Sequence, residues 1–180
     1  MRDNGTADTD SETGSAAVRD DDRRGRTPDL NPRQTAVFVA VAILLIDQLT
    51  KAWAVSALSD GPIVLIEGLL QLRLTYNTGA AFSMFQQGGP VLAVIAVGVI
   101  GVIMLVLGDA SRRSEAIALG MVLGGSLGNL YDRITGSQGF LDGAVVDFID
   151  FDFFATFNVA DMSISLGVGL LLLVTFLRRS

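Results

Sequence analysis

The chain has 180 residues, half of them apolar, and it contains neither cysteine nor histidine. Without cysteine there are no disulfides, thiol nucleophiles or Cys-ligated metals, and without histidine the usual general base and the commonest metal ligand are missing. A Ser-His-Asp hydrolase, a papain-like protease and an HExxH zinc protease are therefore excluded. The formal net charge of −6, with no basic patch in the apolar part, also argues against a nucleic-acid partner.

The charges are concentrated at the N-terminus. Residues 1–33 hold six basic and eight acidic side chains but only six apolar residues. Such a segment cannot bury enough surface to offset the entropy it would lose on ordering. We therefore predict a disordered charged arm over 1–33 and a single membrane domain over 34–180.

Four apolar segments follow the arm, at 35–58, 90–108, 114–131 and 158–177. A helix needs about 20 apolar residues to cross a bilayer, so each segment is a candidate span. A soluble bundle is disfavoured because a chain of this length has too little polar surface to cover four such helices. The first segment also resembles a cleaved signal peptide, but Asp47 and Lys51 within it and the three later spans argue against that interpretation.

The arginines predict the orientation of these spans. They cluster before the first segment, between the second and third, and after the fourth: Arg23, Arg24, Arg26, Arg33, Arg112, Arg113, Arg178 and Arg179. Under the positive-inside rule four spans then have both termini in the cytoplasm and the loops 59–89 and 132–157 outside. Residues 70–76 alternate between apolar and polar, and residues 145–154 are β-branched and aromatic with carboxylates at intervals, so we expect a small sheet or hairpin outside the membrane.

Within the third segment, Gly120, Gly124 and Gly128 recur at every fourth position. This spacing predicts a face of small residues that allows close packing against another helix. We expect it to bring Asn129 and Asp132 into a crowded interior.

Ionisable residues inside the spans need a partner or a purpose, because each costs about 2.5–3.5 kcal/mol to insert. Asp47 and Lys51 are four residues apart on one helix face, and a structural ion pair is the favoured interpretation. Asp132 and Arg133 are adjacent, so their partners are expected elsewhere. For these two residues a structural salt bridge and a catalytic role both remain open.

Two further carboxylates lie at the outer ends of the spans. Asp161 shares a face with Asn158 at the start of the fourth segment, where a helix cap is the alternative role, and Asp147 lies in an apolar strand-like run. If they meet, one can activate water while the other holds a proton that polarises a carbonyl. From the residues alone, an intramembrane aspartyl hydrolase and a proton-coupled carrier both remain open.

Five sequence motifs help to choose between these two functions. They are DQLTK (47–51), NTGAAFS (77–83), GGSLGNLYDR (124–133), GAVVDFID (143–150) and FNVADMSISLG (157–167). In this order they resemble the lipoprotein signal peptidases, the type II signal peptidases of bacteria, across about residues 35–177. The resemblance implies an α-helical membrane protein with four transmembrane helices and a small extracytoplasmic β-cradle. It also implies a multi-pass location in the bacterial cytoplasmic membrane, with both termini cytoplasmic and the active site near the outer face.

By this resemblance the chain is an aspartic endopeptidase that removes the signal peptide from diacylglyceryl-modified prolipoproteins, just before the lipidated cysteine. Asp147 and Asp161 form the dyad that activates water, with no cofactor and no metal. The implied partners are diacylated prolipoprotein signal peptides, membrane lipid and globomycin-type peptide inhibitors. The implied supporting residues are Asn77, Gly79, Asn129, Arg133, Asn158, Asp47, Lys51 and Asp132.

The chain departs from the family pattern in its long acidic arm and in a short loop between Asp147 and Asp161. Other membrane functions fit less well. A proton-coupled transporter needs polar residues through the depth of the bilayer, which the second segment lacks. A phosphatidyl-alcohol transferase needs a D-x-x-D-G run, which does not occur, and a structural adaptor needs neither aspartate.

Overall fold

The structure is a computed structural model that describes residues 30–79, 88–136 and 141–179. The chain divides after Leu30, and the elements belong to Asn31–Ser180. In order they are α1 (Pro32–Ala57), β1 (Ile63–Ile66), β2 (Leu70–Asn77), α2 (Gly88–Val106), α3 (Arg113–Thr135), β3 (Val145–Phe151) and α4 (Val159–Arg179). The four helices match the four predicted segments to within a few residues. Residues 1–29 of the predicted arm lie outside the described residues.

The first helix begins with a capping box. The side chain of Asn31 accepts from the backbone N–H of Gln34 at 2.9 Å, and the Gln34 side chain accepts from the N–H of Asn31 at 3.0 Å. Pro32 occupies the first helical position, where its missing N–H costs nothing. These contacts start α1 two residues before the expected domain boundary at 34.

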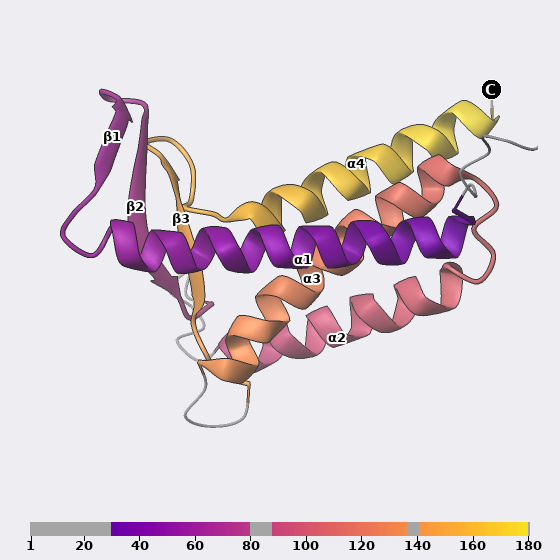
Figure 1. The fold of residues 1–180 in the computed structure, drawn as a ribbon, viewed down its shortest axis with the longest axis horizontal. Helices are drawn as coiled ribbons and strands as arrows, with labels where there is room; N and C mark the ends of the chain where they lie inside the picture. The colour runs from indigo at the N-terminus through magenta and orange to yellow at the C-terminus, as the bar shows by residue number, and fades with distance from the viewer. Residues whose placement is uncertain (1–29, 80–87, 137–140, 180) are drawn as a thin grey trace, which may run out of the picture. The chain divides into compact units, whose positions relative to one another are not determined.

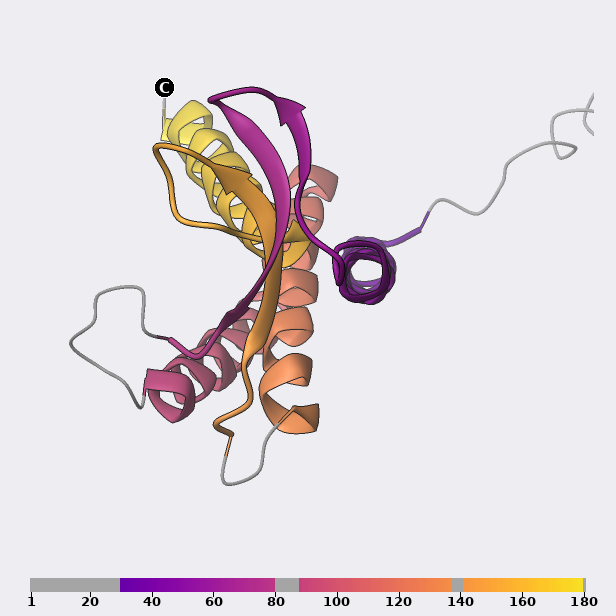
Figure 2. The same ribbon diagram turned by 90° about the vertical axis from the view of Figure 1, so that its left-hand side faces the viewer.

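The three strands form one antiparallel sheet in the order β1-β2-β3. Figure 1 shows this sheet at one end of the helices, where α1 and α3 end and α2 and α4 begin, and Figure 2 views the sheet from that end. The register pairs Thr75 with Asp147 and Asn77 with Val145. Strands β2 and β3 fall in the two segments predicted to be strand-like, while β1 was not predicted.

The helix α3 packs against α1, α2 and α4. Its glycines allow close approach on two sides. A Cβ atom at Gly120 or Gly124 would lie 2.6 Å from a backbone carbonyl oxygen of α1, which is closer than real contacts allow. On the other side, a Cβ at Gly125 would lie 2.5 Å from the carbonyl oxygen of Ala160 in α4. The predicted packing role of the glycine face is confirmed, and Gly125 extends it to a second helix.

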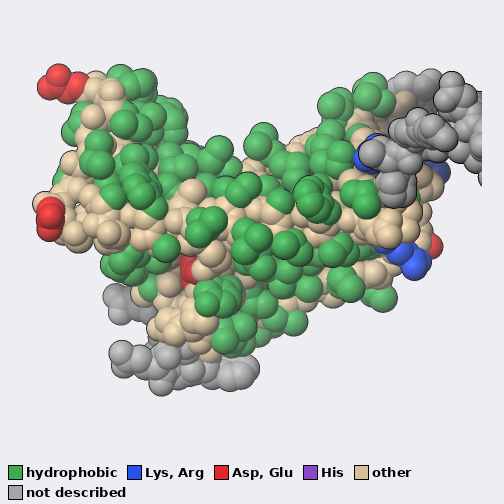
Figure 3. Space-filling model, in the orientation of Figure 1, with side chains coloured by type: hydrophobic (Ala, Val, Ile, Leu, Met, Phe, Trp, Pro, Cys, Tyr) green, Lys and Arg blue, Asp and Glu red, His purple; other side chains and the backbone are tan. Residues whose placement is uncertain are grey.

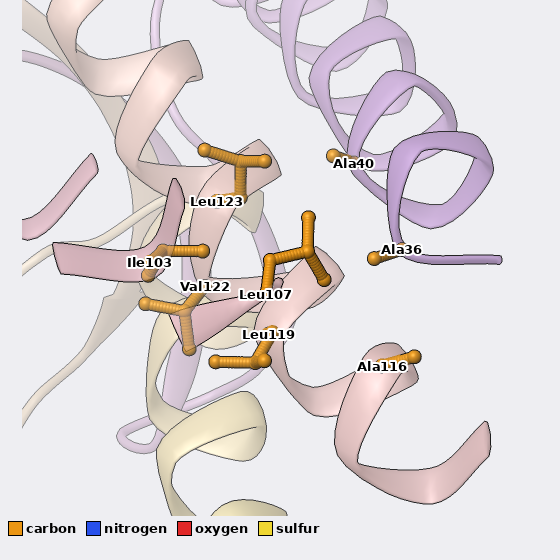
Figure 4. Close-up of a cluster of buried hydrophobic side chains, with 8 residues drawn as sticks. All are labelled: Ala36, Ala40, Ile103, Leu107, Ala116, Leu119, Val122 and Leu123. Atoms are coloured by element: carbon orange, nitrogen blue, oxygen red, sulfur yellow. The ribbon is translucent and has the colours of Figure 1, made fainter. Parts of the chain in front are cut away.

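A cluster of small and branched apolar side chains fills the space between α1, α3 and the end of α2 (Figure 4). Its members are Ala36, Ala40, Ile103, Leu107, Ala116, Leu119, Val122 and Leu123. The large apolar side chains of α1, α2 and α4 instead point outward, and Figure 3 shows them covering much of the helical surface. Exposed apolar helices of this kind are typical of membrane spans.

Of the described helices, α1, α2 and α4 are long and apolar enough to cross a membrane. The helix α3 was also predicted to be a span, but it is less apolar than these three helices and does not qualify by the same measure. It carries Arg113, Glu115, Asp132 and Arg133, and about half of its residues are buried. Because α3 contacts protein on several sides, it does not need the apolar surface that a lipid-facing helix requires.

Candidate active site

Two aspartates from different elements approach one asparagine at the sheet end of the helices. Asp147 lies in β3 and is 1% exposed, while Asp161 lies in the first turn of α4 and is partly buried. Asn158, which is fully buried, donates through Nδ2 to Asp147 Oδ1 at 2.6 Å and through its backbone N–H to Asp161 Oδ2 at 3.3 Å. Asn158 therefore connects the two carboxylates that the sequence singled out, with its side-chain amide on Asp147 and its backbone N–H on Asp161.

The carboxylate of Asp147 is held from its second side by Asn77, whose Nδ2 donates to Oδ2 at 3.0 Å. The Asn77 oxygen in turn accepts from the backbone N–H of Gly79 at 2.8 Å. Gly79 has a φ of +92°, and a Cβ there would lie 2.9 Å from the carbonyl carbon of Gly88, so the position requires glycine. Burial raises the pKa of Asp147 to about 6, although the hydrogen bond from Asn77 opposes the shift.

Asp161 takes part in a helix cap and in a second contact. Its backbone N–H donates to the side-chain oxygen of Asn158 at 2.9 Å, which, with the return bond from Asn158, makes a reciprocal cap for α4. Its Oδ1 also accepts from Asn129 Nδ2 at 2.7 Å. The capping role considered for Asp161 is therefore present, and the carboxylate also has a partner on α3.

A buried ionic network joins α1, α3 and the first turn of α4 next to the two aspartates, Asp147 and Asp161. Lys51 Nζ lies 2.7 Å from Asp47 Oδ2 and 2.8 Å from Asp132 Oδ2, and it donates to Asn129 Oδ1 at 3.0 Å. The other oxygen of Asp47 accepts from the backbone N–H of Ala160 at 2.9 Å, in the first turn of α4. The predicted pair of Asp47 and Lys51 is confirmed, and it is connected both to Asn129 and to the helix that carries Asp161.

Asp132 and Arg133 have their partners on other elements or other turns, as expected for adjacent helical residues. Asp132 accepts from Gln48 Nε2 at 2.9 Å and from the backbone N–H of Val146 at 3.3 Å, in addition to its ion pair. Arg133 donates through Nη1 to the carbonyl oxygen of Asn129 at 3.1 Å. Its Nε is buried and has no hydrogen-bond partner among the described residues.

All ten residues named from the sequence belong to one chain of hydrogen bonds and ion pairs. They are Asp47, Lys51, Asn77, Gly79, Asn129, Asp132, Arg133, Asp147, Asn158 and Asp161. Gln48, which joins this network, was not predicted because a polar residue beside Asp47 gives no sign of which helix it faces. Within the described ranges, no three acidic side chains converge as a metal-binding group.

Three pockets adjoin the two aspartates. One of about 490 Å³ is lined by Asp161 and by apolar side chains that include Phe154 and Leu166. A second of about 230 Å³ contains Asp147 and Asn77, and a third of about 330 Å³ contains Asn77, Asp161 and the following further residues: Leu92, Ile95, Ala96, Val99, Ser126, Asn129, Arg133 and Ile164. An apolar groove beside two carboxylates suits a peptide substrate with an apolar segment.

A further buried carboxylate, Asp150, was not predicted as a site residue. It lies three residues after Asp147, and because side chains alternate along a strand it belongs to the other face of β3. The hydrogen bond from Arg73 lowers the pKa of Asp150. The sequence did contain a signal for this contact. Gln71 and Arg73 alternate with leucines in β2, which places both polar side chains on one face of the sheet, where they donate to Asp150.

The family model described as signal peptidase (SPase) II matches residues 39–177. This chain belongs to the signal peptidase II family. A lipoprotein signal peptidase of Rhodococcus jostii (strain RHA1) is 40% identical over 176 residues, which are 93% of this chain and 87% of that protein. Another, from Hydrogenovibrio crunogenus (strain DSM 25203 / XCL-2), is 40% identical over 153 residues, covering 79% of this chain and 85% of its own.

The fold of this family member is also found in a solved bacterial membrane enzyme. The two chains are 25% identical with a TM-score of 0.69, and the match covers 81% of this chain and 90% of the other. The resemblance inferred from the five motifs is confirmed. The chain is a membrane peptidase of the signal peptidase II family.

Proposed function

We propose that this chain is an intramembrane aspartyl endopeptidase that removes the signal peptide from diacylglyceryl-modified prolipoproteins, cleaving just before the lipidated cysteine. The observation that carries the proposal is the pair of carboxylates, Asp147 and Asp161, held through Asn158 where three pockets adjoin. The substrate class rests on the relatives, which are lipoprotein signal peptidases.

The two carboxyls divide the work of hydrolysis. Asp147, whose pKa burial raises to about 6, holds the proton and donates it to the scissile carbonyl oxygen. Asp161 takes a proton from water as the water oxygen bonds to the carbonyl carbon. When the tetrahedral intermediate collapses, the C–N bond breaks, Asp161 returns its proton to the leaving amine, and the carbonyl oxygen returns its proton to Asp147.

The neighbouring groups orient the substrate. The guanidinium of Arg133 and the amides of Asn77 and Asn129 line the same pocket, and each offers N–H donors suited to a peptide carbonyl. The diacylglyceryl chains remain in the surrounding lipid, which supplies binding energy without a protein contact to every methylene. A globomycin-type peptide inhibitor would occupy the same groove beside the dyad.

We infer four spans with both termini in the cytoplasm. Basic side chains gather at the end of the helices away from the sheet (Figure 3), where Arg33, Arg112 and Arg178 belong. Acidic side chains lie at the sheet end, where Asp60 follows α1 and Glu67 lies between β1 and β2. By the positive-inside rule the sheet and the dyad are then on the outer side. The helix α3 crosses the membrane surrounded by its neighbours.

The test is cleavage of a synthetic diacylated prolipoprotein peptide by the purified protein in detergent. We expect cleavage on the amino side of the lipidated cysteine, identified by mass spectrometry, and no cleavage of the same peptide without the diacylglyceryl group. EDTA is expected to leave the rate unchanged, since the mechanism uses no metal. Equal cleavage of both peptides would contradict the proposed substrate class, and loss of activity in EDTA would contradict the proposed mechanism.

A further inference from the structure

The carboxylate of Asp150 joins two parts of the chain that surround the candidate site. Its Oδ2 accepts from Arg73 Nε and from Gln71 Nε2, each at 2.8 Å, and both donors lie on β2. Its Oδ1 accepts from the hydroxyl of Thr156 at 3.0 Å, in the segment between β3 and α4. Asp150 is only 6% exposed, so this arrangement is a buried carboxylate held by three donors.

Thr156 belongs to a short segment, residues 154–157, that we call the pocket wall. All four of its residues line the pocket of about 490 Å³ that contains Asp161. Two of them, Ala155 and Thr156, also line the pocket of about 230 Å³ that contains Asp147. The wall therefore borders both the pocket that contains Asp161 and the pocket that contains Asp147.

The backbone fixes the two ends of the wall. Phe154 N–H donates to the carbonyl oxygen of Phe151 at 3.0 Å, and Phe157 exchanges two hydrogen bonds with Ile149, at 2.9 and 3.0 Å. Between these ends, the hydroxyl of Thr156 connects the middle of the wall to the sheet through Asp150. The residue that follows the wall is Asn158, which contacts both dyad aspartates.

We propose that Asp150 is a positioning residue whose carboxylate holds Thr156 and so fixes the wall between the two pockets that receive the substrate. The inference rests on the proposed function, because those pockets are substrate sites only if the dyad cleaves a peptide. The hydrogen-bond partners of the Asp150 carboxylate are Gln71, Arg73 and Thr156 rather than either dyad residue. Removing the Asp150 carboxylate is therefore expected to affect substrate binding more than the chemical step.

The kinetic test compares Asp150→Asn and Thr156→Val with the matched control Asp152→Asn, which makes the same change at an exposed aspartate outside the wall. We expect each of the first two to raise KM for the diacylated peptide about fivefold with kcat nearly unchanged, the effect of one lost hydrogen bond on binding. The double variant is expected to be no worse than the more affected single variant. Thr156→Ser retains the hydroxyl and is expected to raise KM less than Thr156→Val.

A second readout does not depend on cleavage. The chain has no cysteine, so Ala155→Cys carries a single spin label within the wall. In its electron paramagnetic resonance spectrum we expect a larger mobile component with Asp150→Asn or Thr156→Val than with Asp152→Asn. An unchanged spectrum and unchanged KM in Thr156→Val would overturn the proposal, as would a lowered kcat and melting temperature with unchanged KM. If the wild type cleaves no diacylated peptide, the proposed function fails and the spin label alone decides the role of Asp150.

Discussion

Replacing Gly128 by alanine tests how the packing of α3 against α1 supports the site. A Cβ at this position would lie 2.5 Å from Asp47 Oδ2 and 3.1 Å from its Cγ. Ordinary contacts are about 3.5 Å or longer, so the carboxylate must move by about 1 Å. That movement weakens its ion pair with Lys51, at 2.7 Å, and its hydrogen bond from Ala160 N–H, at 2.9 Å.

The expected cost follows from these contacts. Overpacking costs about 1–3 kcal/mol, and breaking a buried ion pair completely costs about 3–5 kcal/mol. Alanine recovers about 1 kcal/mol relative to glycine inside a helix. Because the ion pair is weakened rather than removed, we expect Gly128→Ala to lower the free energy of unfolding by about 2–4 kcal/mol. Cleavage activity should fall as well, since Ala160 belongs to the first turn of the helix that carries Asp161.

The assay is an SDS titration of the purified protein in detergent, followed by the fluorescence of Trp53, the single tryptophan. Its ring meets Phe148 edge-on with centroids 6.4 Å apart, so the signal reports contact between α1 and β3. The matched control is Gly101→Ala on α2, where nothing lies within 4 Å of the added Cβ. We expect the control to be neutral or more stable by up to about 1 kcal/mol. Equal stability and activity of the two variants would refute the reasoning.

Three other predictions use the same purified protein or intact cells. Lys51→Met strands two buried carboxylates and is expected to lower the free energy of unfolding by about 3–5 kcal/mol in the SDS titration; a stable but inactive variant would instead assign Lys51 to the chemistry. Because the pKa of Asp147 is raised to about 6 and its protonated form is needed, kcat/KM is expected to fall as the pH rises above about 6, and a rise through pH 8 in a pH–rate profile would contradict this. In sealed cells, an impermeant thiol reagent is expected to label Ser59→Cys but not Ser111→Cys; the reverse pattern would invert the proposed topology.

The same shift at Asp147 has a consequence for stability. Its pKa in the folded protein, about 6, is above the ordinary value of 3.8. The folded state therefore binds this proton more tightly than the unfolded chain does. The resulting stabilisation is complete below pH 3.8 and is lost as the pH rises through about 6.

The helices and the polar residues of the site could be predicted from the sequence because their signals are local. Apolar runs of about 20 residues located the helices, and the spacing of Asp47 with Lys51 and of Asn158 with Asp161 predicted their contacts. The strand β1 was missed because its four residues, Ile63–Ile66, form a short apolar run without alternation.

Long-range pairing could not be predicted in the same way. Lys51 and Asp132 lie far apart in the sequence, and only the packing of α1 on α3 makes Asp132 the third member of the ion network. The bond between Asp150 and Thr156 depends on the chain folding back after β3. The helix α3 was predicted as a span like the others, because only the packed structure shows that α1, α2 and α4 surround it and that it needs less apolar surface than they do.

Cleavage of the diacylated peptide by purified Asp147→Asn and Asp161→Asn tests the central claim most directly. Asparagine keeps the size of the side chain but can neither accept a proton from water nor hold one for the carbonyl. We predict that each variant loses cleavage while its SDS midpoint stays near that of the wild type, and that the double variant is no worse than either, since the two residues act as one unit. Substantial cleavage by either well-folded variant would contradict the assignment of the dyad.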